Sequence, residues 1–188
     1  MKKTLLLIIT LLILLTACGN KYEGDFSFEV QPFEFTNQEN TTFSSSELEG
    51  KFWVADMIFT NCDSVCPPMT GNMARLQDKL KQEGLDVELI SFSIDPETDT
   101  PEKLKTYAGD RGANFENWNL LTGYEFQEIK EFAIKSFKAP VDKIADSDQM
   151  IHTFYFYLIT PDGNAIKRYD GTKAANMDEI VNDIKKMM

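Results

Sequence analysis

Apolar residues gather in short runs separated by polar segments, a pattern typical of alternating strands and helices. Residues 26–35 alternate apolar and polar side chains, which predicts a strand, and Pro32 within it favours the edge of a sheet. Residues 52–59 and 86–94 are mostly apolar over the length of one strand. Such runs are typical of central strands buried on both faces, so we expect both at the middle of one sheet.

Helical spacing follows these strands. Pro67 and Pro68 suit the first turn of a helix, and apolar residues then recur every three or four positions, at Met69, Met73, Leu76 and Leu80. Further helices are expected at 100–110, with Thr100 as cap, at 124–137, and from Asn176, where Asn176 and Glu179 resemble a capping box. We expect Met69 and Met73 to pack in the core.

The remaining apolar segments predict a short strand at 118–121 and a strand at 153–159, which the turn at 161–164 joins to a strand at 165–169 in a hairpin. Between the helix at 124–137 and this hairpin lies an acidic loop, residues 142–148, whose role the sequence does not reveal. The order of elements predicts an α/β fold with a central mixed sheet flanked by helices.

Composition limits the function. The chain has 188 residues, of which 43% are hydrophobic, and its 19 basic and 30 acidic residues give a formal charge of -11. An acidic protein of this kind repels a phosphate backbone, so we expect no nucleic-acid partner. Three cysteines and one histidine are present, and any thiol or soft-metal chemistry must use these four positions.

The N-terminus has the pattern of a lipoprotein signal peptide. Two lysines precede an apolar run at 4–17, which is shorter than the roughly 20 residues that a membrane-spanning helix needs. The sequence Leu-Thr-Ala-Cys-Gly around Cys18 resembles a lipobox, which predicts a signal peptide at 1–17 and a lipid on Cys18. Cleavage would change the charge from -11 to -13, because it removes two lysines and no acidic residue.

The expected mature chain is then a lipidated Cys18 with a tether over 18–25, followed by one domain at 26–188. Because no basic patch is available to bind lipid headgroups, acyl chains are the expected membrane attachment. We therefore expect a lipid-anchored protein at the cell membrane that faces the extracytoplasmic side.

Cys62 and Cys66 lie where the first central strand meets the helix that follows it. Their spacing of four places both side chains near one face of a first helical turn, so they can close a disulfide or share a metal ion. The helix N-terminus favours thiolate over thiol, which both chemistries require. An inert structural disulfide is the alternative, although a bond that closes so short a loop would add little stability.

His152 is the histidine of the chain and stands just before the late strand at 153–159. If that strand runs antiparallel to the strand before Cys62, His152 lies at the same end of the sheet as the two cysteines. Two thiolates and one imidazole form a soft ligand set that suits Cu(I), and also Cu(II) with a further donor. Zinc would require a fourth ligand or a water molecule.

Three segments together resemble the Sco (SenC) family of copper proteins. They are the CxxxCP motif that ends at Pro67, the motif DPETDTP that ends at Pro101, and the distant Ile151-His152 before an apolar strand. The resemblance covers the chain from about Phe26 to its end. It implies a thioredoxin-like (redoxin) fold and a role in assembling the binuclear copper centre of cytochrome c oxidase, whose copper-bearing subunit would be the partner.

Carried over by position, the resemblance implies that Cys62, Cys66 and His152 bind copper and that Asp95 tunes the site without binding the metal. An alternative function is a thiol-disulfide oxidoreductase in which Cys62 and Cys66 keep the oxidase copper-site cysteines reduced. Three residues separate the two cysteines, and no proline occurs in 141–160, so the chain departs from general disulfide reductases of the thioredoxin type. The copper donor is not identifiable from the sequence.

Overall fold

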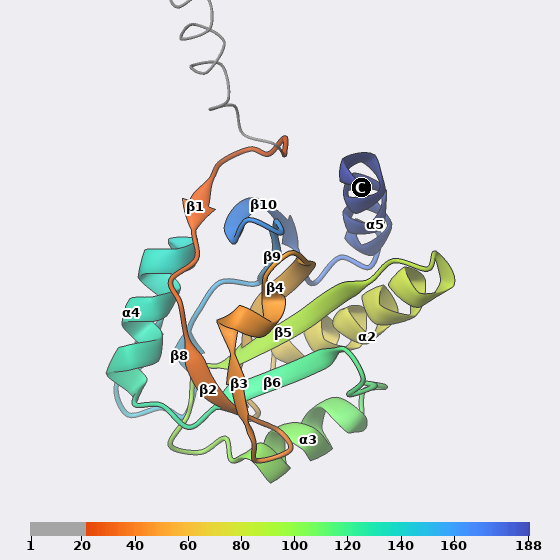
Figure 1. Cartoon of the computed structure of the whole chain (residues 1–188). Coiled ribbons are helices and arrows are strands. Elements are labelled where there is room, and N and C mark those ends of the chain that lie inside the picture. Colours follow the sequence, from red (N-terminus) through yellow and green to blue (C-terminus); the bar gives the residue numbers. More distant parts are fainter. Residues whose placement is uncertain (1–21) are drawn as a thin grey trace, which may run out of the picture.

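The computed structural model describes residues 22–188 and is built around a sheet of eight strands (Figure 1). Their spatial order is β1-β10-β9-β4-β5-β6-β2-β3. Strands β4, β5 and β6 are parallel, and β9 is antiparallel to β4. The strands are β1 (Phe28–Glu29), β2 (Glu34–Asn37), β3 (Thr42–Ser44), β4 (Phe52–Ile58), β5 (Val87–Ser93), β6 (Trp118–Thr122), β9 (Tyr155–Ile159) and β10 (Asn164–Asp170).

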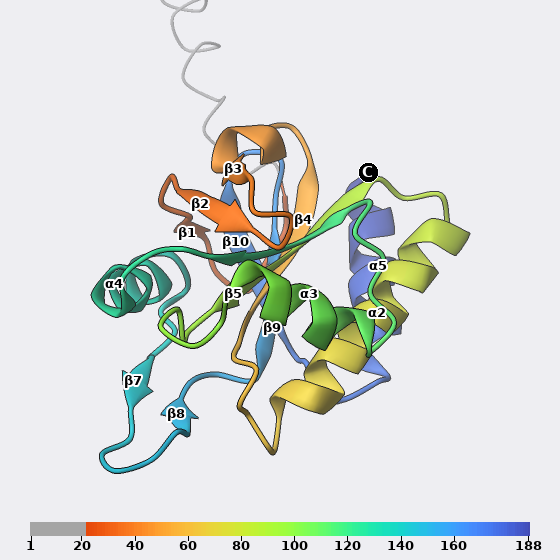
Figure 2. The ribbon, with the colours of Figure 1, turned by 90° about the horizontal axis from the view of Figure 1, so that it is seen from below.

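Helices cover both faces of this sheet. Figure 2 shows α2, α3 and α5 on one face and α4 on the other. Their bounds, with those of a short 3-10 helix η1, are η1 (Ser45–Leu48), α2 (Cys66–Gln82), α3 (Pro101–Gly109), α4 (Phe126–Phe137) and α5 (Asn176–Met187). This mixed sheet between helices is a thioredoxin-like α/β fold, as the sequence predicts.

The central strands supply the core. All seven residues of β4 are buried, which confirms the prediction of a strand covered on both faces. On the α4 side, aromatic rings pack against one another, and the centroids of Phe92 and Phe132 lie 4.9 Å apart. On the α2 side, Met69 and Met73 are fully buried, as expected for core residues. Burial of this apolar surface is the main force that holds the two layers on the sheet.

The predicted strand at 26–35 is interrupted. It forms β1 and β2, and the backbone between them bonds to other parts of the molecule: the Gln31 amide donates to Ser136 Oγ at 3.1 Å and the Phe33 amide to Ser45 Oγ at 3.2 Å. Pro32 has no N–H to offer a neighbouring strand, so the ladder breaks there.

The structure confirms one predicted helix cap and corrects another. Thr100 Oγ1 accepts a hydrogen bond from the Lys103 amide at 3.3 Å, so the predicted cap of α3 is confirmed. The prediction of a capping box at the start of α5 is wrong. Ala175 occupies the cap position without a side-chain bond, and Asn176 lies inside the helix, where its Nδ2 donates to the carbonyl of Asp170 at 3.1 Å.

The acidic segment forms a small hairpin. Strands β7 (Asp142–Lys143) and β8 (Met150–Ile151) pair with each other in a two-stranded sheet, separate from the main one (Figure 2). Strand β9 begins at Tyr155, two residues later than predicted, and Phe154 before it is exposed.

The N-terminal predictions fall largely outside the described residues. The expected signal peptide at 1–17 and the lipid on Cys18 both lie there. At the start of the described part, the amides of Asp25 and Phe26 donate to the carbonyl of Ile166 on β10 at 2.9 and 3.2 Å. Within residues 22–188, no helix has both the length and the apolar character needed to cross a bilayer.

Candidate metal centre

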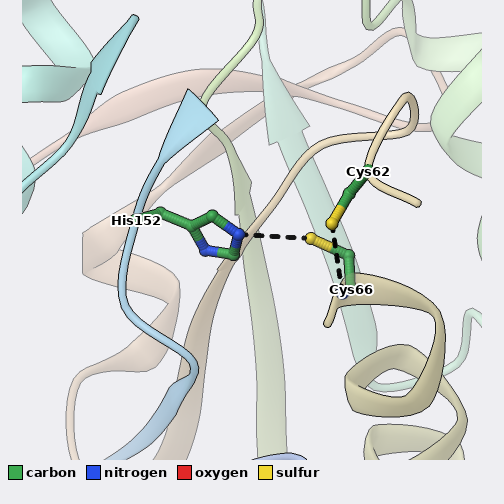
Figure 3. A group of neighbouring side chains, drawn as sticks. All are labelled: Cys62, Cys66 and His152. Carbon is green, nitrogen blue, oxygen red and sulfur yellow. Dashed lines mark hydrogen bonds between the residues drawn. The ribbon is translucent and has the colours of Figure 1, made fainter. Parts of the chain in front are cut away.

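The two cysteines lie at the junction of β4 and α2. Cys66 is the first residue of α2, and its backbone N–H donates to Sγ of Cys62 at 3.3 Å (Figure 3). Helix N-termini offer such unpaired N–H groups and a partial positive charge, both of which stabilise a thiolate. Both cysteines are free thiols and both are buried, so their chemistry takes place at the edge of the core.

His152 reaches the cysteines from the segment between β8 and β9. Because β9 runs antiparallel to β4, the start of β9 lies beside the end of β4, as the sequence argument requires. Nε2 of His152 lies 3.6 Å from Sγ of Cys66 (Figure 3). Nδ1 lies 2.8 Å from the carbonyl oxygen of Thr153. Since a carbonyl only accepts, Nδ1 carries the proton and the Nε2 lone pair faces the cysteines.

Cys62, Cys66 and His152 together form a group that could hold a metal ion. Their ligand atoms all lie within 4.8 Å of one another, and among residues 22–188 this is the one such group. The Phe59 ring meets the imidazole edge to face, with centroids 5.6 Å apart, and shields it on one side. Two sulfurs and one imidazole nitrogen in a largely buried group are a donor set that fits copper.

The two thiols differ sharply in acidity. Hydrogen bonding from Cys66, through its side chain and its backbone N–H, lowers the pKa of Cys62 to about 4. The same interaction, together with burial, raises the pKa of Cys66 far above its usual value. Cys62 is therefore the more acidic of the two thiols, and Cys66 holds its proton more tightly.

Asp99, from the motif DPETDTP, anchors the segment that leads to Cys62. Its buried carboxylate accepts hydrogen bonds from Oγ1 of Thr60 at 2.5 Å, from the Thr60 amide at 3.2 Å and from Ser93 Oγ at 2.7 Å. Burial raises the pKa of Asp99. Asp95, the residue that the sequence singled out, is half-buried, and its carboxylate makes no hydrogen bond or ion pair with the described residues.

Replacing Asp99 by alanine should lower the free energy of unfolding by about 2–3 kcal/mol, because the Thr60 amide and two hydroxyls lose a charged acceptor. Urea unfolding at pH 7 measures this loss, and Asp95→Ala is the matched control, with an expected change below about 0.5 kcal/mol. Equal losses in the two variants would contradict the anchoring role of Asp99.

A second buried carboxylate lies in the middle of β4. Asp56 is fully buried, and its Oδ1 accepts a hydrogen bond from Ser91 Oγ at 2.6 Å. Ser91 Oγ in turn accepts from Nε1 of Trp118 at 3.0 Å. Oδ2 of Asp56 has no partner, and burial raises the pKa of this group to about 7. Sequence reasoning missed Asp56, because an isolated acid within an apolar run carries no recognisable motif.

The fold and this Cys-Cys-His group define a class: thioredoxin-like proteins with a soft-metal site at the start of the first helix after a central strand. The chain belongs to the SCO1/SenC family, whose model matches residues 23–188. It is 49% identical over 174 residues to the SCO1 protein homolog of Bacillus subtilis (strain 168), an alignment that covers 92% of this chain and 90% of that protein.

Solved structures agree with this assignment. A SCO1/SenC family lipoprotein from Bacillus anthracis str. Ames matches with a TM-score of 0.82 and 44% identity, over 85% of this chain and 95% of the other. BsSco is described as a member of the Sco family of cytochrome c oxidase assembly proteins with a disulfide switch. It matches with a TM-score of 0.80 and 48% identity, over 88% of this chain and 97% of the other. Arabidopsis thaliana ScoI, solved with copper bound, matches with a TM-score of 0.71 and 26% identity, over 83% of this chain and 98% of the other.

Proposed function

We propose that this protein is a copper chaperone that binds copper through Cys62, Cys66 and His152 and serves the assembly of the binuclear copper centre of cytochrome c oxidase. The observation that carries the proposal is the convergence of three soft donors within 4.8 Å of one another. Copper-bound relatives and the description of BsSco as an oxidase assembly protein support it. The partner would be the copper-bearing subunit of the oxidase.

The resting site is arranged for a metal cation. The Cys62 thiolate supplies the first negative ligand, and the hydrogen bond from Nδ1 of His152 to the Thr153 carbonyl keeps the lone pair of Nε2 available. Cys66 holds its proton more tightly than Cys62 and must give it up when copper binds, so copper uptake should release protons. With both thiolates bound, copper would neutralise a charge that the buried site could not otherwise hold.

We also propose the tuning role for Asp95. Its backbone N–H donates to Ser93 Oγ at 3.1 Å, and that hydroxyl donates to Asp99, the anchor of the segment before Cys62. Asp95 is thus connected to the cysteine segment through a short chain of hydrogen bonds. The negative charge of Asp95 would then favour the copper-loaded site over the empty dithiol.

The proposed location is the extracytoplasmic face of the cell membrane, with a lipid on Cys18 as the anchor. The lipobox-like sequence around Cys18 supports this location, and so does the Bacillus anthracis relative, which is described as a lipoprotein. The acidic charge of the chain leaves acyl chains as the means of attachment.

A thiol-disulfide oxidoreductase is the second candidate function. The low pKa of Cys62 favours it, because a thiolate is the attacking group in thiol exchange. The disulfide switch described for BsSco points the same way. His152 separates the two functions, since a metal site needs its nitrogen and exchange needs only the cysteines.

Replacing His152 by alanine should weaken copper binding about 100-fold, because one of three ligands is lost, while a disulfide between the cysteines can still form. Titration of the reduced chain with Cu(I) against a competing chelator measures the affinity. Thr153→Ser, which keeps the carbonyl that anchors the ring, is the control and should bind like wild type. Unchanged affinity in His152→Ala would refute the ligand assignment and favour the oxidoreductase.

A further inference from the structure

Apolar side chains are exposed next to the metal centre. Among the described residues, three of the five exposed large hydrophobic side chains occur within eleven positions of one another: Ile144, Ile151 and Phe154, which are 43%, 51% and 39% exposed. His152 lies between the last two. Exposed apolar residues scattered singly need no explanation, but a group of them around a functional residue marks an interaction surface.

The β7–β8 hairpin carries this group and is fixed beside the cysteines. Nε2 of Gln149 donates to the carbonyl of Asn61, the residue before Cys62, at 3.0 Å. Nζ of Lys143 lies 2.7 Å from Oε1 of Glu97, in the loop that follows β5. The hairpin pairs with no strand of the main sheet and stands out from the body of the molecule (Figure 2). We call residues 142–154 the hairpin rim.

The same surface is strongly acidic. Six acidic residues and one basic residue lie in the hairpin rim and in the two loops that flank it, 60–65 and 95–98, whereas the whole chain has 30 acidic and 19 basic residues. The six acidic residues of this surface are Asp63, Asp95, Glu97, Asp142, Asp146 and Asp148, and the basic residue is Lys143. Lys143 forms an ion pair with Glu97. Asp142 forms an ion pair with Lys130 of α4, in which Nζ lies 2.9 Å from Oδ2. The carboxylates of Asp63, Asp146 and Asp148 are exposed and make no ion pair with any described residue.

We propose that the hairpin rim is the docking surface for a protein that presents lysine or arginine side chains around an apolar patch. This inference rests on the proposed function and assigns that surface to the copper-receiving subunit. Because Cys66 is fully buried, copper can pass directly between proteins only if the partner covers the face where His152 and the rim are accessible. The exposed isoleucines and Phe154 would supply the contact centre, and the aspartates would steer the approach.

The test replaces Asp146 and Asp148 together by asparagine. Asp146 has a φ of 57°, a left-handed conformation that asparagine tolerates well, so the backbone of the turn is preserved. The change Asp148→Asn keeps an oxygen that can accept the hydrogen bond from Gln149 Nε2. The copper-loaded full chain is mixed with the purified, copper-free copper-bearing subunit of the oxidase, and the transfer rate is followed by rapid mixing at low and high ionic strength.

Wild-type transfer should slow as salt is added, and Asp146→Asn/Asp148→Asn should be about 3- to 10-fold slower at low salt, with a weaker dependence on salt. The control replaces two exposed acids at the opposite end of the sheet, Glu29→Gln/Asp162→Asn, and should behave like wild type. Copper affinity should be unchanged in both variants. A rim variant that transfers as fast as wild type, or a control that slows equally, overturns the docking surface.

A second variant tests the apolar centre: Ile151→Ser should slow transfer at high salt as well, where steering is screened. Transfer by Ile151→Ser at the wild-type rate would contradict that part of the inference. Failure of the wild-type chain to bind copper is a different result, since it overturns the proposed function itself.

Discussion

Replacing Cys66 by serine should reduce copper affinity by about a thousandfold, the largest effect we expect from one side chain. Structural zinc sites with four ligands contribute about 10–16 kcal/mol, which is about 2.5–4 kcal/mol for each ligand, and a thousandfold loss lies at the upper end of that range. A serine hydroxyl does not ionise at neutral pH and is a poor ligand for a soft ion, so the site loses both a donor and a negative charge. Titration of the reduced variant with Cu(I) in the presence of a competing chelator measures the change.

Ser64→Ala is the matched control for this variant. Oγ of Ser64 lies 3.8 Å from Sγ of Cys62, so the hydroxyl is close to the site without being part of the ligand group. We expect less than a threefold change in affinity. Wild-type affinity in Cys66→Ser would mean that copper binds elsewhere, and the proposed function would fail with it.

Replacing Asp56 by asparagine should strongly change the pH dependence of stability. The pKa of Asp56 is raised from 3.8 to about 7, because the carboxylate is buried with one oxygen unpartnered. The folded protein therefore holds this proton more tightly than the unfolded chain. The contribution of Asp56 to wild-type stability must fall as pH rises from about 4 to about 7, and above pH 7 the full penalty of about 4 kcal/mol remains.

Asparagine has no such charge to bury. The free energy of unfolding of Asp56→Asn, minus that of wild type, should therefore be about 4 kcal/mol larger at pH 8 than at pH 4. Urea unfolding at the two pH values gives this difference, and any constant cost of the amide cancels from it. Asp63→Asn, which neutralises an exposed carboxylate, is the control variant. A difference below about 1 kcal/mol for Asp56→Asn would contradict the burial of an ionised Asp56.

Much of the fold could be predicted because its core elements have unambiguous patterns. Strand β4 is a continuous, mostly apolar run, and it is buried along its whole length. Helix α2 starts at Cys66 with two prolines in its first turn, where proline is tolerated. The pattern was weaker where hydrogen bonds to distant residues set the structure. The break between β1 and β2 depends on Ser45 and Ser136, which no local signal in 26–35 reveals.

The candidate site shows the same division. Cys62, Cys66 and His152 were predictable from their rarity and from the positions of β4 and β9, and the structure brings all three together. The residues that hold these three side chains in place were not predictable from the sequence. Asp99 was recognisable only as part of a motif, and its bonds to Thr60 depend on the approach of two loops 39 residues apart. The hairpin beside His152 appeared in the sequence as an acidic loop, because strands of two residues are too short to show periodicity.

The central claim is that one copper ion is held by the sulfur atoms of Cys62 and Cys66 and by Nε2 of His152. X-ray absorption spectroscopy at the copper edge, on the full chain loaded with one equivalent of Cu(I), tests it most directly. The account predicts two sulfur neighbours and one imidazole nitrogen, with the imidazole signal absent from His152→Ala. A copper ion with no sulfur neighbours, or a wild-type spectrum without an imidazole signal, would contradict it.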